Sequence, residues 1–388
     1  MARYQFFAVC PRHTEPLVIE ELASHGVTDA RAYAGGVQFA CEPAPCMAFI
    51  LHTRIASKVL LRIASRVCAD EDALYATARR IPWEKCFGVE KSVRVDVSAH
   101  RSPLASLDFA LLRVKDAVCD RFRDACGARP DVDKENPGVR IHVFLDGTTA
   151  TFYFNVAGEA LFKRGWRTEK GEAPLKENLA ASLLKLAGWN PSIPLMDPFC
   201  GSGTIAIEAA QTAIGLPAGL SRRFGFENLR LFDAEVFAEI REEAKSRVRY
   251  DAPVKIAASD ISTIVVGKAR ANALRAGLGA LLEDGRLTFA ATDARDLEPA
   301  GAPGFVVCNP PYGEQSNPKS ASVAGMVKDV GDNFKRRFAG WSVFMLTSDR
   351  ALPREMRLKE SRKIEIYNGP LECRFFRFDM VAGSNRKP

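Results

Sequence analysis

From residue 179 onward, short apolar runs alternate with longer segments whose apolar residues recur at helical spacing. The short runs predict buried strands at 195–196, 255–259, 287–291, 305–308 and 342–346, and the longer segments predict helices at 179–187, 205–214, 262–276 and 322–338. Strands that alternate with helices favour a mostly parallel sheet. A terminal hairpin is predicted at 362–380, because Asn368-Gly369 separates two apolar stretches there. The pattern therefore predicts an α/β domain in this half.

The pattern before residue 158 predicts two smaller mixed units. In the first, strands at 4–10 and 37–41 flank a helix that Thr14 can cap and that runs to about His25. In the second, the predicted elements are a helix at 74–81, a strand at 93–98, a helix at 106–126, and a hairpin of 139–145 with 150–155 around Asp146-Gly147. Both units read as small α+β structures.

Residues 45–67 predict one long helix. On it, four cations at i, i+4 spacing share one stripe, namely Arg54, Lys58, Arg62 and Arg66. Such a stripe is either a solvated face or a phosphate-facing surface. The sequence alone leaves both interpretations open.

Length and these patterns together predict several domains in the 388-residue chain. The boundaries we expect are 1–50 for a ferredoxin-like unit, 51–157 for a second small domain, 158–178 for a linker and 179–388 for the α/β domain. The linker is rich in Pro, Gly and charge, which favours an ordered crossing segment.

A glycine turn follows the first strand of the α/β domain. Asp197 stands at the carboxyl end of the strand, and Gly201 and Gly203 let the backbone turn tightly and approach a ligand. Thr204 can cap the helix that follows. The glycines are too few for a dinucleotide fingerprint, and no Lys follows them as in a P-loop. In open α/β sheets, ligands bind at the carboxyl ends of the strands beside such a turn.

Two further acids follow strands of the same sheet. Asp260 ends the second strand, where an acid accepts hydrogen bonds from ribose hydroxyls of a nucleotide-like cofactor. It stands 57 positions after Gly203, against the usual interval of about 20, because residues 215–253 form an insertion. Asp293 follows the third strand and can accept from an adenine amino group. Each of the two acids could instead be a helix cap.

The tetrapeptide Asn309-Pro310-Pro311-Tyr312 follows the fourth strand and suits chemistry at an exocyclic amine. Such an amine is a poor nucleophile, because its lone pair is delocalised into the ring. The Asn309 side-chain oxygen and the Pro310 carbonyl can accept both N–H bonds and direct the nitrogen toward a methyl donor. Pro311 stiffens the loop, and Tyr312 offers a ring on which a base can stack.

Composition narrows the class of protein. The sequence is 47% hydrophobic and 26% charged, with a net charge of +7, which is compatible with nucleic acid. The ten Cys form no C-x-x-C pair and the five His do not cluster, so we expect no metal site. No apolar run approaches the length of a membrane span, and the first ten residues lack signal-peptide features. We expect a cytoplasmic protein, and the sequence says nothing about its oligomeric state.

The run 197–204 resembles motif I of class I S-adenosylmethionine-dependent methyltransferases, and Asn309-Pro-Pro-Tyr312 resembles the partner motif. The phrase 75–83, the helix after Ser106 and the hairpin resemble a THUMP domain, an RNA-binding module. The whole chain resembles RNA guanine-N2 methyltransferases of the RlmL type, also called UPF0020-type, that couple THUMP to a Rossmann-like catalytic domain. The likeness is strongest at 161–210 and 305–314. The second methyltransferase half of some relatives is absent, so the resemblance implies a single activity.

This resemblance implies a seven-stranded mixed sheet, S-adenosyl-L-methionine as cofactor, and transfer to guanine N2 in structured RNA, with 23S rRNA as the first choice. The cofactor residues it implies are Asp197, Pro198, Phe199, Gly201, Ser202, Gly203, Thr204, Asp260, Ile261, Asp293, Ala294 and Asn309. The RNA-binding candidates are Arg79, Arg80, Lys85, Arg101, Lys163, Arg164 and Arg167. The alternatives are transfer to a tRNA guanine, to DNA adenine N6 or to a protein glutamine, and an RNA-binding factor without catalysis.

Overall fold

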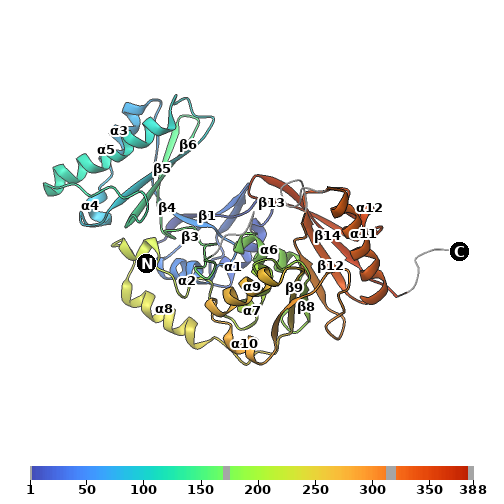
Figure 1. Ribbon diagram of the computed structural model, residues 1–388. Coiled ribbons are helices and arrows are strands. Elements are labelled where there is room, and N and C mark those ends of the chain that lie inside the picture. Colours follow the sequence, from blue (N-terminus) through green and yellow to red (C-terminus); the bar gives the residue numbers. More distant parts are fainter. Residues whose placement is uncertain (1, 169–174, 312–319, 383–388) are drawn as a thin grey trace. The chain divides into compact units, whose positions relative to one another are not determined.

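The computed structural model describes residues 2–168, 175–311 and 320–382, with side chains omitted at 320–324. The chain divides into two compact units. The N-terminal unit comprises Met1–Cys10, Val18–Leu161 and Ser221–Glu243, and the C-terminal unit comprises Pro11–Leu17, Phe162–Leu220 and Ala244–Pro388. Each unit is built on one seven-stranded sheet (Figure 1).

The sheet of the N-terminal unit has the strand order β2-β3-β1-β4-β7-β6-β5. Its strands are β1 (Tyr4–Val9), β2 (Ala30–Tyr33), β3 (Gly36–Cys41), β4 (Lys58–Val67), β5 (Val93–His100), β6 (Val139–Asp146) and β7 (Thr149–Asn155). The helices are α1 (Glu15–Ala23), α2 (Pro43–His52), α3 (Glu71–Arg80), α4 (Trp83–Cys86) and α5 (Leu107–Cys126). Strand β4 pairs with both β1 and β7, so the two small units expected from the sequence share one sheet.

The long helix predicted for 45–67 is wrong. Helix α2 ends at His52, and residues from Lys58 onward form strand β4. The β-branched residues Val59, Ile63 and Val67 favour a strand, because their χ1 freedom is restricted in a helix. A bulge between Arg62 and Ala64 shifts the register of β4 against β7, so the four cations do not form one regular stripe.

The insertion after the glycine-turn helix belongs partly to the N-terminal unit. It contains a short 3-10 helix, η1 (Gly225–Asn228), and the start of α8 (Ala234–Ser246). The Phe226 N–H donates to the Val156 carbonyl at 2.9 Å, and the Arg230 N–H donates to the Cys86 carbonyl at 2.9 Å. The Arg222 guanidinium donates to the carbonyls of residues 159–161. These bonds fix a segment from the C-terminal half of the sequence to the N-terminal sheet.

The sheet of the C-terminal unit has the order β10-β9-β8-β11-β12-β14-β13, and its first five strands are parallel. Its strands are β8 (Leu195–Asp197), β9 (Ile256–Asp260), β10 (Leu287–Ala291), β11 (Phe305–Cys308), β12 (Ser342–Thr347), β13 (Arg362–Asn368) and β14 (Leu371–Asp379). The helices are α6 (Glu177–Ala187), α7 (Thr204–Ala213), α9 (Thr263–Arg275), α10 (Gly279–Glu283), α11 (Ser320–Arg337) and α12 (Leu352–Glu355). The predicted mixed sheet with a terminal antiparallel pair is confirmed.

Two apolar clusters fill the two faces of this sheet. Side chains alternate along a strand, so Val307 and Phe344 join the cluster with helices α6, α7 and α9. Their neighbours Val306 and Met345 join the cluster with α11 and α12. Because strands buried on both faces read as continuous apolar runs, the strands of this half were visible in the sequence.

The carboxyl ends of the five parallel strands meet at one edge of the C-terminal sheet. This edge, which we call the catalytic edge, carries Asp197 as the last residue of β8, Asp260 as the last residue of β9 and Asn309 directly after β11. In the described part of the chain, no helix combines the length and apolar character needed to cross a bilayer.

Candidate functional site

The glycine turn connects β8 to α7 through residues 198–203. Gly201 has φ +51° and Gly203 has φ +85°, values that favour glycine. A Cβ on Gly203 would also lie 3.1 Å from Ala269 Cβ and 3.1 Å from Phe289 Cε1. Gly203, and not Thr204 as the sequence suggested, is the N-cap residue of α7. The turn therefore requires glycine both for its dihedral angles and for close packing.

Asp260 is bound directly to the glycine turn despite the long insertion between them. Its Oδ2 accepts the Gly201 N–H at 3.2 Å, and its Oδ1 accepts the Ser262 N–H at 3.0 Å. Its neighbour Ile261 is exposed, at 70%. The turn and the second strand thus form one continuous structure at the catalytic edge.

Asp197 is buried at the base of the turn, with 1% of its surface exposed. Burial is the main reason that the pKa of Asp197 rises to about 8; the Phe199 N–H, which donates to Oδ1 at 3.3 Å, opposes the rise, and the nearby charge of Asp260 adds to it. The adjacent Pro198 is buried and Phe199 is half-buried. The site therefore holds a carboxyl group that titrates near neutral pH.

Asn309 follows β11 and carries an unpaired acceptor. Its Oδ1 is buried and has no hydrogen-bond partner among the described residues. Pro310 is buried and Pro311 is half-buried, whereas Tyr312 lies outside the described residues. A buried oxygen without a donor costs free energy, so this position favours a ligand that brings an N–H or O–H group.

Asp293 lies two residues beyond β10, and Arg295 engages it. Both carboxylate oxygens accept from the Arg295 Nε at 3.0 Å, and Oδ2 also accepts from Nη2 at 2.6 Å. The hydrogen bonds from Arg295 hold the pKa of Asp293 below its usual value. The next residue, Ala294, is buried, and its carbonyl accepts from Asn333 at 3.2 Å.

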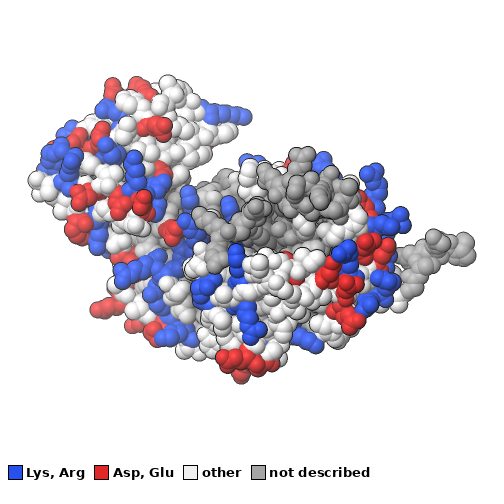
Figure 2. Space-filling view, viewed as in Figure 1, with Lys and Arg blue, Asp and Glu red and all other residues white. Residues whose placement is uncertain are grey.

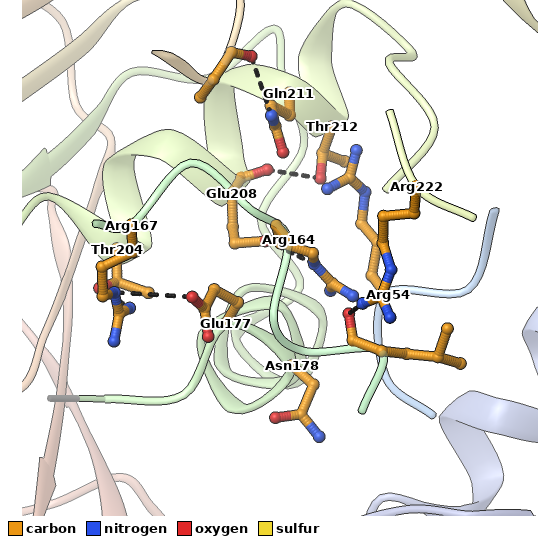
Figure 3. A network of polar contacts seen from close by, with 12 residues as sticks. Arg54, Arg164, Arg167, Glu177, Asn178, Thr204, Glu208, Gln211, Thr212 and Arg222 are labelled. Atoms are coloured by element: carbon orange, nitrogen blue, oxygen red, sulfur yellow. Dashed lines mark hydrogen bonds and ion pairs between the residues drawn. The ribbon is translucent and has the colours of Figure 1, made fainter. Parts of the chain in front are cut away.

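The connection at 162–168 contributes two arginines that the structure buries (Figure 3). Arg164 Nε lies 3.1 Å from Glu208 Oε1, and the two side chains are 2% and 0% exposed. Arg167 donates to Thr204 Oγ1 at 2.7 Å, and its Nε lies 3.5 Å from Glu177 Oε1. Both arginines therefore bind carboxylates inside the unit. Of the three cations expected to contact RNA here, Lys163 is the exposed one.

The Arg167–Glu177 pair is strongly desolvated. Burial lowers the pKa of Arg167 and raises that of Glu177, in each case against the attraction of the partner. Removing both charges from water costs free energy, which opposes their mutual attraction. Through this pair and the bond to Thr204, Arg167 links the connection at 162–168 to both α6 and α7.

A second polar network holds the glycine turn from α9. Asn272 Nδ2 donates to the Ser202 carbonyl at 3.0 Å, and Arg275 Nη2 donates to Asn272 Oδ1 at 2.5 Å. Arg275 Nε donates to the Trp166 carbonyl at 2.9 Å. Sequence reasoning missed both residues, although two polar groups three positions apart on one helix face can contact each other and were a usable signal.

The expected RNA contacts of the N-terminal unit lie at its surface. Arg80, Lys85 and Arg101 are exposed, and Arg101 has φ +52°. Arg79 is also exposed but pairs with Asp124 at 2.7 Å. Three of these four cations can therefore bind an anionic partner without the loss of an ion pair that the structure shows.

The sheet order, the glycine turn and the carboxyl-edge residues define the class I methyltransferase fold. The family described as "RMKL-like, methyltransferase domain" matches residues 164–377, and the chain belongs to this family. The THUMP domain matches residues 68–155, and the RlmL ferredoxin-like domain matches residues 5–60. The resemblance expected from the sequence is confirmed.

Curated relatives carry a common name. The ribosomal RNA large subunit methyltransferase K/L of Shewanella frigidimarina is 37% identical over 390 residues, which cover 99% of this chain and 54% of the relative. The protein of the same name from Shewanella amazonensis is also 37% identical, over 99% of this chain and 54% of its own length. The chain therefore spans about half the length of these relatives.

Solved structures share the architecture over the whole chain. A putative methyltransferase, SMU.472, described as complexed with SAH, superposes with a TM-score of 0.86 at 27% identity, over 99% of this chain and 100% of the other. A predicted N6-adenine-specific DNA methylase from Listeria monocytogenes gives a TM-score of 0.87 at 28% identity, over 98% and 97%. TrmN from Thermus thermophilus, at 22% identity and a TM-score of 0.70 over 98% and 100%, shows the fold alone.

Proposed function

We propose that the chain transfers the methyl group of S-adenosylmethionine to the exocyclic N2 of a guanine in structured RNA. The substrate we favour is large-subunit ribosomal RNA, because relatives at 37% identity are named for it and a THUMP domain precedes the catalytic unit. The exposed cations Arg80, Lys85, Arg101 and Lys163 are our candidates for phosphate contacts. A ribosomal RNA substrate would place the protein in the cytoplasm.

The observation that carries this proposal is the buried Asn309 Oδ1 without a partner among the described residues. Asn309 lies at the catalytic edge, directly after β11, the strand that pairs with β8 and hence ends beside the glycine turn. An exocyclic amine can supply the missing donor. Asn309 and the Pro310 carbonyl would then accept both N–H groups and fix the direction of the nitrogen lone pair.

The residues at this edge suit a cofactor with a ribose and a positive charge. We propose that Asp260 binds the ribose hydroxyls, that the turn at Gly201 and Gly203 lies against the cofactor, and that Asp197 favours its cationic part. Asp293, held by Arg295, would face the adenine. When bound, S-adenosylmethionine supplies an activated methyl group. The stacking role of Tyr312 stays a prediction.

Substitution of Asn309 tests this function. Asn309→Ala should lower methyl transfer from tritiated S-adenosylmethionine to ribosomal RNA by about 10²- to 10³-fold, because one positioned acceptor is lost. Cofactor affinity in calorimetry should stay within about threefold, since neither the glycine turn nor Asp260 changes. Full activity in this variant would contradict the role of Asn309.

The same assay separates the rival acceptors. The Listeria structure is named a predicted DNA adenine methylase, and an amine on adenine offers the same N–H donors as guanine N2. If the methyl group goes to tRNA, duplex DNA or protein in preference to ribosomal RNA, that acceptor replaces the proposed substrate. A chain that fails to bind the cofactor in calorimetry would instead be an RNA-binding factor without catalysis.

A further inference from the structure

A basic pocket lies on the C-terminal unit, on the segment that connects β12 to β13. Its volume is about 610 Å³, and four of its lining residues are cations, namely Arg350, Arg354, Arg357 and Lys359. One lining residue, Glu360, is acidic. We call this feature the α12 pocket. None of these residues has a role in the site described above.

The pocket follows the catalytic edge closely in the chain, because its first lining residue, Arg350, lies three positions beyond the end of β12. Strands β11 and β12 are parallel neighbours, and Cys308, which directly precedes Asn309, pairs with Met345. Arg350 follows Met345 by five positions, a reach of at most about 17 Å even in a fully extended chain. A polymer whose base reaches Asn309 therefore has neighbouring units within reach of the α12 pocket.

Most of the cations in the pocket are available to a ligand. Arg350 pairs with Glu372 at 2.7 Å but remains 73% exposed. Arg354, Arg357 and Lys359 are exposed, and within the described ranges none of the three forms a side-chain ion pair. Cations gathered in this way repel one another, and an anion with several charges relieves that repulsion. The surrounding surface is mixed in charge, with blue and red atoms over the α11 and α12 side (Figure 2).

The backbone of the pocket is held in a strained conformation. Arg357 has φ +53°, in the left-handed region that residues other than glycine seldom adopt. The Met356 carbonyl beside it packs so closely on α11 that a Cβ on Gly331 would lie 2.5 Å from its oxygen. Lys335 Nζ also donates to this carbonyl at 3.1 Å. The strain is therefore maintained by specific packing, which is frequent at functional segments.

We infer that the α12 pocket binds backbone phosphates of the RNA strand that presents the target base, an inference that rests on the proposed function. Guanidinium groups bind phosphate in a bidentate manner, and phosphate contacts fix the register of a nucleic acid without reading its sequence. Four cations that line one pocket suit a strand with repeated charges better than they suit a single small anion. The pocket thereby positions the strand on the catalytic unit itself.

The test uses the full chain with two charge-matched triple variants. The pocket variant is Arg354→Gln/Arg357→Asn/Lys359→Gln, in which Asn tolerates the left-handed backbone. The control variant is Lys255→Gln/Arg270→Gln/Arg336→Gln, which removes three exposed cations of the same unit outside the pocket. The probes are in vitro transcribed 23S rRNA, titrated at several KCl concentrations, and tritiated S-adenosylmethionine for activity.

The pocket variant should bind the RNA about 10- to 50-fold more weakly, and the slope of log K against log salt should become shallower by about 2. Its KM for RNA should rise in parallel, while cofactor affinity in calorimetry stays unchanged. The control variant should change RNA affinity by less than about threefold.

Three outcomes would overturn the inference. If both variants bind RNA alike while the wild-type chain methylates it, the pocket has no RNA role and the proposed function stands. If the wild-type chain does not methylate RNA, the proposed function fails and the inference fails with it. If a polyglutamate peptide binds with the affinity and salt slope of RNA, the pocket serves an acidic protein.

Discussion

A single buried carboxyl group, Asp197, makes the stability of this protein depend on pH near neutrality. Burial raises its pKa to about 8, so the folded state holds a proton that the unfolded chain releases near pH 4. The protein alone should therefore lose stability as pH rises from about 4 to 8, by at most about 1.4 kcal/mol per pH unit. A bound cation at the site would oppose this loss, because it favours the carboxylate.

Asp197→Asn should remove this dependence, since an amide of the same shape does not titrate. Denaturant unfolding at pH 5, 6, 7 and 8 measures the free energy of unfolding of both proteins. The stability of the variant should increase relative to that of the wild type as pH rises, and its cofactor affinity at pH 8 should be lower than that of the wild type. Parallel curves across this range would show that Asp197 is ionised in the folded protein.

At the scale of one residue, the sequence located the polar groups at the carboxyl ends of buried strands. Asp197, Asp260 and Asn309 were visible because each comes after an apolar run, and parallel strands end at one edge. The burial of Arg164 and Arg167 was not visible, because the acids that pair with them come from α6 and α7. Charge in a sequence does not show whether its partner is water, RNA or a carboxylate.

Among the elements, α7 depends on the ion pair between its Glu208 and Arg164. Glu208 is 0% exposed, so Arg164→Ala would remove a cation that pairs with a buried carboxylate and should cost about 3 kcal/mol of stability. The double variant Arg164→Met/Glu208→Leu removes both charges and should recover most of that loss. Chemical denaturation of the wild type and the two variants measures the free energy of unfolding. Equal losses of stability in the single and double variants would contradict a charge effect.

Element type was predicted well in the C-terminal half and less well at the N-terminus. Apolar runs of four to six residues between helical patterns identified β10, β11 and β12 closely. The helix prediction for residues 45–67 failed beyond His52, because residues four apart share a face in a regular strand as well as in a helix. The β-branched residues of this segment favour the strand, β4. Strand β2 was missed, since four residues with mostly exposed side chains carry no apolar pattern.

At the scale of the whole molecule, the insertion joins parts of the chain that are distant in sequence. Residues 221–243 lie in the C-terminal half of the sequence but group with the N-terminal unit, where Asn228 Nδ2 donates to the Gly138 carbonyl at 2.9 Å. No local pattern encodes such a contact, because its partners are about 90 positions apart and neither is apolar. A sequence can show that an insertion exists without showing what it binds.

Gly225 gives the last prediction, because it lets the insertion approach the N-terminal sheet. A Cβ there would lie 2.5 Å from the Asn155 carbonyl oxygen and 3.0 Å from the Gly158 nitrogen, and these backbone atoms cannot move independently. Gly225→Ala should therefore destabilise the protein by about 1 to 3 kcal/mol through overpacking. Gly267→Ala is the matched control, since a Cβ at this position in α9 meets nothing within 4 Å and should stabilise the helix by up to about 1 kcal/mol. Thermal and denaturant unfolding of both variants measure the contrast, and similar stabilities would mean that the insertion is not anchored through Gly225.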